Sequence, residues 1–125
     1  MQKDNLKNET PTDANNVLAV RLIANFMGWV NSPYDNLPNK VYNTDLSEGK
    51  PLDQFRFHNS WDEFMLVYSE IGRVWFNIPD YKKKKFEGTS TYRAIQNRIL
   101  LGNLTDAFKL SVAFVKEWNA FKADR

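Results

Sequence analysis

The chain has 125 residues, of which 42% are hydrophobic and 14% aromatic, so it is long and apolar enough to fold rather than remain disordered. It has no cysteine and one histidine, which excludes disulfides, zinc–thiolate sites, cysteine nucleophiles and any metal site built on several imidazoles of one chain. The formal net charge of +2 is too small to indicate a polyanionic partner by itself.

Residues 1–14 are polar, carry charges of both signs and contain no apolar run. A secretory signal needs a continuous hydrophobic segment after its positive start, and this segment has none. No apolar run elsewhere approaches the roughly 20 residues that cross a bilayer. We therefore expect a frayed tail over residues 1–14, one folded domain over residues 15–125, no membrane contact, and a soluble protein of the cytoplasm.

The first helix is predicted over about residues 15–27. Its apolar residues recur at helical spacing, and Gly28 follows where a left-handed residue commonly ends a helix. Trp29 is expected to fold back onto the helix end and to pack at the edge of the core.

A change of periodicity organises the middle of the chain. The alternation of Phe55 and Phe57 with polar neighbours predicts a strand over residues 54–57. At Ser60 the period becomes three and four residues, and Ser60 with Glu63 matches the capping box. We therefore predict a helix that Ser60 caps, with an apolar stripe made of Trp61, Phe64, Met65, Tyr68 and Ile71.

Two further strands are predicted on either side of this helix. Turn-forming residues dominate between residues 31 and 53. Within this segment Val41 and Tyr42 predict a short strand over residues 40–43, which is expected to pair with residues 54–57. Gly72 is expected to end the central helix. The alternation after it predicts a third strand over residues 73–78.

The last third of the sequence is predicted to be helical. One apolar stripe stops at Gly102, and Thr105 is expected to cap a longer helix that runs to about residue 122. The chain is thus predicted to be an α+β protein with a small antiparallel sheet of about three strands packed against about four helices. Its expected core includes Trp61, Phe64, Phe108 and Phe114.

Three segments together resemble a family of small uncharacterised proteins from bacteriophage genomes and prophage-like regions. They are residues 22–29 (LIANFMGW), residues 57–65 (FHNSWDEFM) and residues 107–119, which end in FVKEWN. The chain departs from the family pattern in having Phe64-Met65 where leucine-methionine-proline is common, and Trp118 where tyrosine is common. The resemblance implies a phage-related origin and transfers no activity or catalytic residue.

His58, Ser60 and Asp62 invite comparison with a catalytic triad because their side chains carry the matching chemistry. A triad depends on spatial geometry, however, and residues this close at a strand-to-helix junction point in different directions. The alternative interpretation is structural: Ser60 caps the helix, Asp62 complements the helix dipole, and His58 bonds near the junction. We favour the structural interpretation, and we predict no catalytic residue, no metal site and no cofactor.

The other candidate is the lysine run Lys82, Lys83, Lys84 and Lys85. With Arg93 and Arg98 it gives residues 81–104 a net charge of +5, so the rest of the chain is net negative. A basic loop flanked by aromatic residues can grip phosphate and stack on bases, and Arg93 is included in that candidate site. The alternative is a solvated loop whose charges keep a sheet edge from pairing with another chain.

Three functional hypotheses follow from the sequence. The first is a non-enzymatic, phage-related accessory protein that binds a macromolecular partner. The second is a weak nucleic-acid-binding module that uses Lys82, Lys83, Lys84, Lys85 and Arg93. The third is an enzyme whose site surrounds His58.

Overall fold

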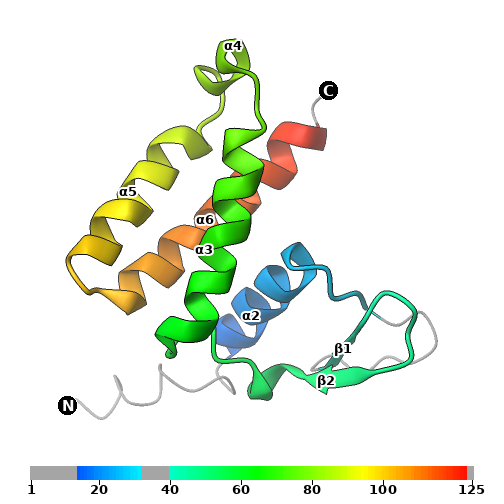
Figure 1. The fold of residues 1–125 in the computed structure, drawn as a ribbon. Coiled ribbons are helices and arrows are strands. Elements are labelled where there is room, and N and C mark those ends of the chain that lie inside the picture. The colour runs from blue at the N-terminus through cyan, green and yellow to red at the C-terminus, as the bar shows by residue number, and fades with distance from the viewer. Residues whose placement is uncertain (1–13, 32–39, 124–125) are drawn as a thin grey trace. The chain divides into compact units, whose positions relative to one another are not determined.

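The computed structural model describes residues 14–31 and 40–123, with the side chains of residues 14–16 excepted, and is drawn as a ribbon in Figure 1. The chain divides after Arg56 into two compact units, Met1–Arg56 and Phe57–Arg125, which we call the N-terminal unit and the helical unit. The predicted tail lies outside the described residues, except that Ala14 already begins a helix. The one-domain prediction for residues 15–125 stays a prediction.

The N-terminal unit begins with α2, Ala14–Phe26, which agrees closely with the first predicted helix. Gly28 has a φ of 106° and ends the helix as predicted, because a residue with a Cβ is strained in this conformation. The N–H of Trp29 donates to the carbonyl of Ala24 over 2.9 Å, which satisfies one of the last free carbonyls of α2. The Trp29 ring then packs edge-on against Phe55 with centroids 5.5 Å apart.

The sheet in the described residues has two strands, not three. β1, Lys40–Tyr42, pairs antiparallel with β2, Gly49–Pro51, and Val41 stands opposite Lys50. The first predicted strand is therefore confirmed, but its partner lies in the segment predicted as a loop. The hairpin closes because Asn43 exchanges bonds with Glu48: its N–H donates to the Glu48 carbonyl over 2.9 Å and its side-chain oxygen accepts the Glu48 N–H over 3.1 Å.

The predicted strand over residues 54–57 is wrong. Residues Leu52–Gln54 form the short 3-10 helix η1, and residues 57–59 form a turn. Phe55 and Phe57 are both buried. Their two-residue spacing thus reflects two buried side chains in an irregular segment, which the alternation alone does not distinguish from a strand.

The helical unit begins with α3, Trp61–Phe76, and Ser60 is its N-cap residue, with the Ser60 hydroxyl accepting the Glu63 N–H over 3.4 Å. The predicted third strand over residues 73–78 is wrong, because α3 continues through Gly72 to a C-cap at Asn77. A Cβ at Gly72 would lie 3.3 Å from the hydroxyl oxygen of Tyr92. Gly72 therefore allows α5 to approach closely, and does not end the helix.

Three more helices complete the unit: α4, Asp80–Lys83; α5, Gly88–Leu100; and α6, Leu104–Ala123. α6 packs against both α5 and α3, as Figure 1 shows. The described residues thus contain five α-helices rather than four. Asn103, not Thr105, caps α6, since its side-chain oxygen accepts the Asp106 N–H over 3.1 Å.

The core of the helical unit is supplied mainly by α3, α5 and α6. Its largest buried side chains on those helices are Phe64, Ile71, Tyr92, Ile95, Phe108 and Phe114. Trp61 was predicted to belong to this core, but it is 37% exposed because it stands in the first turn of α3, beyond the end of the packed stripe. None of the helices in the described ranges has the length and apolar composition needed to cross a membrane.

Candidate nucleic-acid interface

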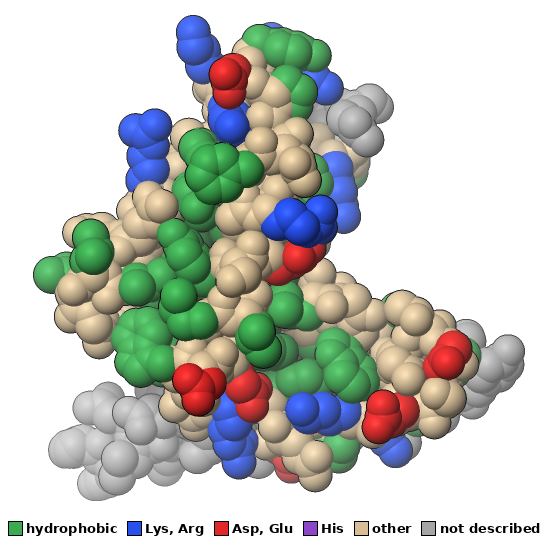
Figure 2. Space-filling view, in the orientation of Figure 1, with side chains coloured by type: hydrophobic (Ala, Val, Ile, Leu, Met, Phe, Trp, Pro, Cys, Tyr) green, Lys and Arg blue, Asp and Glu red, His purple; other side chains and the backbone are tan. Residues whose placement is uncertain are grey.

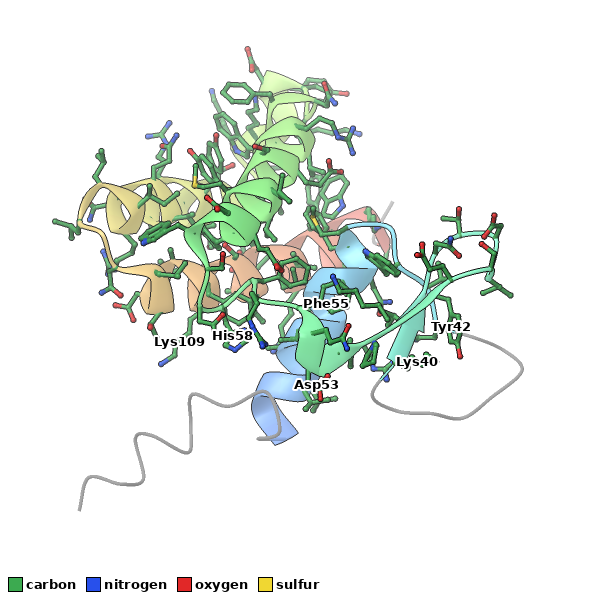
Figure 3. All side chains as sticks on the ribbon, turned by 60° about the horizontal axis from the view of Figure 1, so that its bottom comes forward. Lys40, Tyr42, Asp53, Phe55, His58 and Lys109 are labelled. Carbon is green, nitrogen blue, oxygen red and sulfur yellow. The ribbon has the colours of Figure 1, made fainter. Side chains whose placement is uncertain are left out.

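His58, Ser60 and Asp62 have separate surroundings in the helical unit. The His58 ring is partly buried with its centroid 5.9 Å from that of Phe108, and Figure 3 labels His58 in the segment that leads into α3. The Ser60 hydroxyl is engaged at the start of α3, and the Asp62 side chain is exposed in the first turn. Among residues 14–31 and 40–123, no group of three or more potential ligand residues could hold a metal ion. Ser60 thus caps α3 and His58 lies against Phe108, while Asp62 stands in the first turn of α3, where the structural interpretation expects it.

The lysine run lies at the end of the helical unit where α3 and α6 finish and α5 begins. Lys82 and Lys83 belong to α4, whereas Lys84 and Lys85 lie in the turn that follows it. The residues before the run are helical, and both strands in the described chain lie in the N-terminal unit. The strand predicted over residues 73–78, just before the run, is instead the end of α3 and the residues that follow it.

One of the four lysines faces inward. The ammonium of Lys83 lies 4.2 Å from the centroid of the Trp75 ring and 3.5 Å from a carboxylate oxygen of Asp80, and its side chain is only 16% exposed. The Trp75 indole N–H donates to the Thr89 hydroxyl over 3.2 Å, and that hydroxyl donates to the Lys83 carbonyl over 2.8 Å. Lys83 thus joins α4 to α3 and α5, and is a structural residue.

Trp75 belongs to a stack of aromatic rings between α3 and α5. Its centroid lies 4.7 Å from that of Tyr92, which in turn stacks on Tyr68 at 5.9 Å. Burial, followed by the hydrogen bond with Tyr68, raises the pKa of Tyr92 to about 12. The Tyr92 phenol is therefore neutral at physiological pH, and through Trp75 the stack contacts Lys83 of α4.

The remaining lysines face solvent. Lys84 and Lys85 are exposed, Lys82 is partly exposed, and within the described chain none of the three forms an ion pair. We define the basic end as Arg73, Lys82, Lys84, Lys85 and Lys122, the last of which lies in the final turn of α6. Figure 2 shows several blue side chains around the region that carries α4 in Figure 1, with red groups next to some of them.

The basic end keeps an excess of positive charge. Arg73 donates through Nε to Glu70 over 3.0 Å and pairs with it again through Nη2, and the hydrogen bonds hold the pKa of the Glu70 carboxyl below its usual value. Glu87, at the start of α5, is exposed beside this end. Arg93 is exposed on the second turn of α5 and stays outside the basic end.

A pocket of about 280 Å³ opens within the basic end. Its cationic lining comes from three helices, with Arg73 on α3, Lys82 on α4 and Lys122 on α6. Its remaining lining is mostly apolar or aromatic, and consists of Val74, Asn77, Ile78, Pro79, Trp118 and Phe121. Neither Arg73 nor Lys122 was singled out from the sequence.

A sequence signal for this pocket does exist. Trp118 and Lys122 are four residues apart, so on a helix they lie on the same face, and the Lys122 ammonium is 5.7 Å from the Trp118 ring centroid. The contribution of Arg73 was hidden, because residues 73–78 were predicted to form a strand.

No protein-family model matches this chain, and neither a curated protein nor a solved structure is significantly similar to it. Any function must therefore be argued from the site itself.

Proposed function

We propose that this chain is a small, non-enzymatic binding protein of the cytoplasm whose macromolecular partner is a nucleic acid, contacted through the basic end. The observation that carries the proposal is that Lys82, Lys84 and Lys85, on α4 and the turn that follows it, have no carboxylate partners among the described residues. The phage-related origin, implied by the resemblance of three sequence segments, is a separate proposal that the comparisons do not support.

Three lysines on one short segment favour a polyanion over a single carboxylate. Each phosphate contact releases condensed counterions, so several weak contacts add up along a charged backbone. Because Lys83 is anchored on Trp75 and Asp80, the turn that carries its neighbours is held in place. A partner therefore meets a positioned set of charges, and less ordering entropy opposes binding.

Exposed aromatic rings favour nucleic acid among polyanions. Phe76 is 66% exposed at the end of α3, and Tyr81 is 71% exposed on α4 beside Lys82. Sulfated or carboxylated polymers offer no aromatic bases, whereas the bases of a nucleic acid stack favourably on exposed aromatic side chains. No observation favours an enzyme centred on His58, because Ser60 and Asp62 beside it have the structural positions described above.

The test is a fluorescence-anisotropy titration of labelled DNA and RNA with the full chain. The variant K82Q/K84Q/K85Q should bind more weakly than the wild type by a similar factor for every sequence, since phosphate contacts position the protein without reading bases. The matched control K40Q/K50Q/K109Q removes the same number of lysine charges elsewhere and should bind nearly as well as the wild type. Equal losses in both variants, or no binding by the wild type, would reject the proposal.

A further inference from the structure

We infer that the pocket of the basic end is a subsite for one unpaired nucleobase and its adjoining phosphate, so that the protein prefers single strands over duplex. The inference rests on the proposed nucleic-acid function and names the form of nucleic acid that the site takes. The residues that line this pocket lie on α3, α4 and α6 and in the segment between α3 and α4, and only Lys82 among them belongs to the lysine run.

The aromatic wall of the pocket is held by rings behind it. Trp118 is half-buried, and it packs edge-on against Phe86 and tilted against Phe121, each with ring centroids 6.1 Å apart. Phe86 is buried and also packs edge-on against Phe114 in the core, at 5.4 Å. Trp118 therefore presents a supported indole, and a base that stacks on it need not order the ring first.

The size of the pocket suits a single base. Pockets for drug-sized ligands hold about 300–1,000 Å³. At about 280 Å³ this pocket lies just below that range. A base in a duplex is paired and stacked inside the helix, and reaches a pocket only after it has been extruded at a cost of a few kcal/mol. Single strands bring their bases without that cost.

The cations around the wall suit a phosphate next to the base. The Lys122 ammonium lies over the Trp118 ring, and Lys82 on α4 also lines the pocket. The Nε and Nη2 groups of Arg73 bond to Glu70, which fixes the guanidinium plane and leaves Nη1 to donate to a ligand. Aromatic stacking next to positive charge is the combination that non-specific single-strand binders use. A peptide of aspartate and glutamate alone would meet the cations but would offer no aromatic ring to the indole.

The experiment compares a short labelled oligothymidylate with a duplex that has the same number of phosphates. Trp118→Leu should weaken single-strand binding by about 5- to 150-fold, the equivalent of one lost base stack, and should leave duplex binding unchanged. Trp61→Leu is the matched control, because it makes the same change at an exposed tryptophan at the start of α3, whereas the pocket lies at the end of that helix. It should alter neither single-strand nor duplex binding.

Two further variants keep the test decisive if Trp118→Leu does not fold. Trp118→Phe keeps a ring that can stack, so single-strand affinity should stay close to that of the wild type while the quenching of tryptophan fluorescence by the oligonucleotide is largely lost. Lys122→Gln changes an exposed side chain and should weaken single-strand binding. Wild-type quenching that persists in Trp118→Phe would overturn the inference.

The outcomes separate the inference from the function on which it rests. Equal affinity for single strand and duplex, or single-strand binding unchanged in folded Trp118→Leu, overturns the inference and leaves the proposed function standing. No binding to any nucleic acid overturns both. If adenosine monophosphate binds as tightly as the oligonucleotide, the ligand is a free nucleotide. If an aspartate-rich peptide binds more tightly than the oligonucleotide and its binding depends on Trp118, the ligand is a protein segment. Either result overturns the single-strand assignment.

Discussion

Phe114→Ala is the change that tests most directly whether α6 packs in the helical unit as described. Phe114 is fully buried, with its ring centroid 5.4 Å from Phe86 and 6.5 Å from Tyr92. Removing the ring loses its burial and leaves a cavity between rigid aromatic neighbours, which costs about 3–5 kcal/mol. At roughly 0.05–0.15 kcal/mol per residue, a unit the size of residues 57–125 has about 3–10 kcal/mol of stability. The variant should therefore lose between about a third and all of that stability, and its urea midpoint should fall well below that of the wild type.

The assay is urea denaturation followed by far-UV circular dichroism. Phe114→Leu keeps most of the apolar volume and should cost about 1.5 kcal/mol or less. Leu100→Ala is the surface control, because Leu100 is 85% exposed and its loss should stay within about 0.5 kcal/mol. The reasoning would be refuted if Phe114→Ala and Leu100→Ala had the same midpoint with unchanged m-values.

Three further predictions concern the cap, the aromatic stack and the lysine run. Ser60→Ala should cost about 1 kcal/mol in a denaturant melt, because the Glu63 N–H at the start of α3 loses its acceptor; a change near zero would count against the cap. The folded state raises the pKa of Tyr92 to about 12, so the folded chain keeps a phenol proton that the unfolded chain releases near pH ~10. The free energy of unfolding should therefore be steady below that pH and should fall as the pH rises to about 12. Denaturant midpoints measured across this range should show a smaller fall in Tyr92→Phe than in the wild type. Lys83→Gln should destabilise the helical unit by about 0.5–1 kcal/mol whereas Lys84→Gln should not, and equal effects in thermal melts would contradict the inward position of Lys83.

The helices were predictable because their apolar spacing and end signals agree. The left-handed Gly28, the cap at Ser60 and the stripe of α6 each follow from local chemistry that the fold does not override. Gly72 misled the prediction, because a glycine after an apolar stripe resembles a helix end. In the structure it makes room for the Tyr92 hydroxyl, a tertiary contact that the local sequence does not reveal.

β1 was predicted from Val41 and Tyr42, whereas β2 was harder to predict because it is short and has no large apolar side chain. β2 contains Gly49, Lys50 and Pro51, none of which favours a strand by its own propensity, and its pairing depends on the Asn43–Glu48 closure. The candidate site shows the same division. The charge of the lysine run was visible in the sequence, but the inward position of Lys83 and the approach of Lys122 to Lys82 depend on how the helices pack.

The salt dependence of nucleic-acid binding by single lysine variants tests the central claim most directly. Three phosphate contacts, from Lys82, Lys84 and Lys85, predict a log–log slope of about −2 on single strands, at about −0.7 per contact. Lys84→Gln and Lys85→Gln should each reduce the slope by about 0.7, whereas Lys83→Gln should leave it unchanged because its ammonium is occupied by Trp75 and Asp80. A slope near zero in the wild type, or an equal loss in Lys83→Gln and Lys84→Gln, would contradict the account.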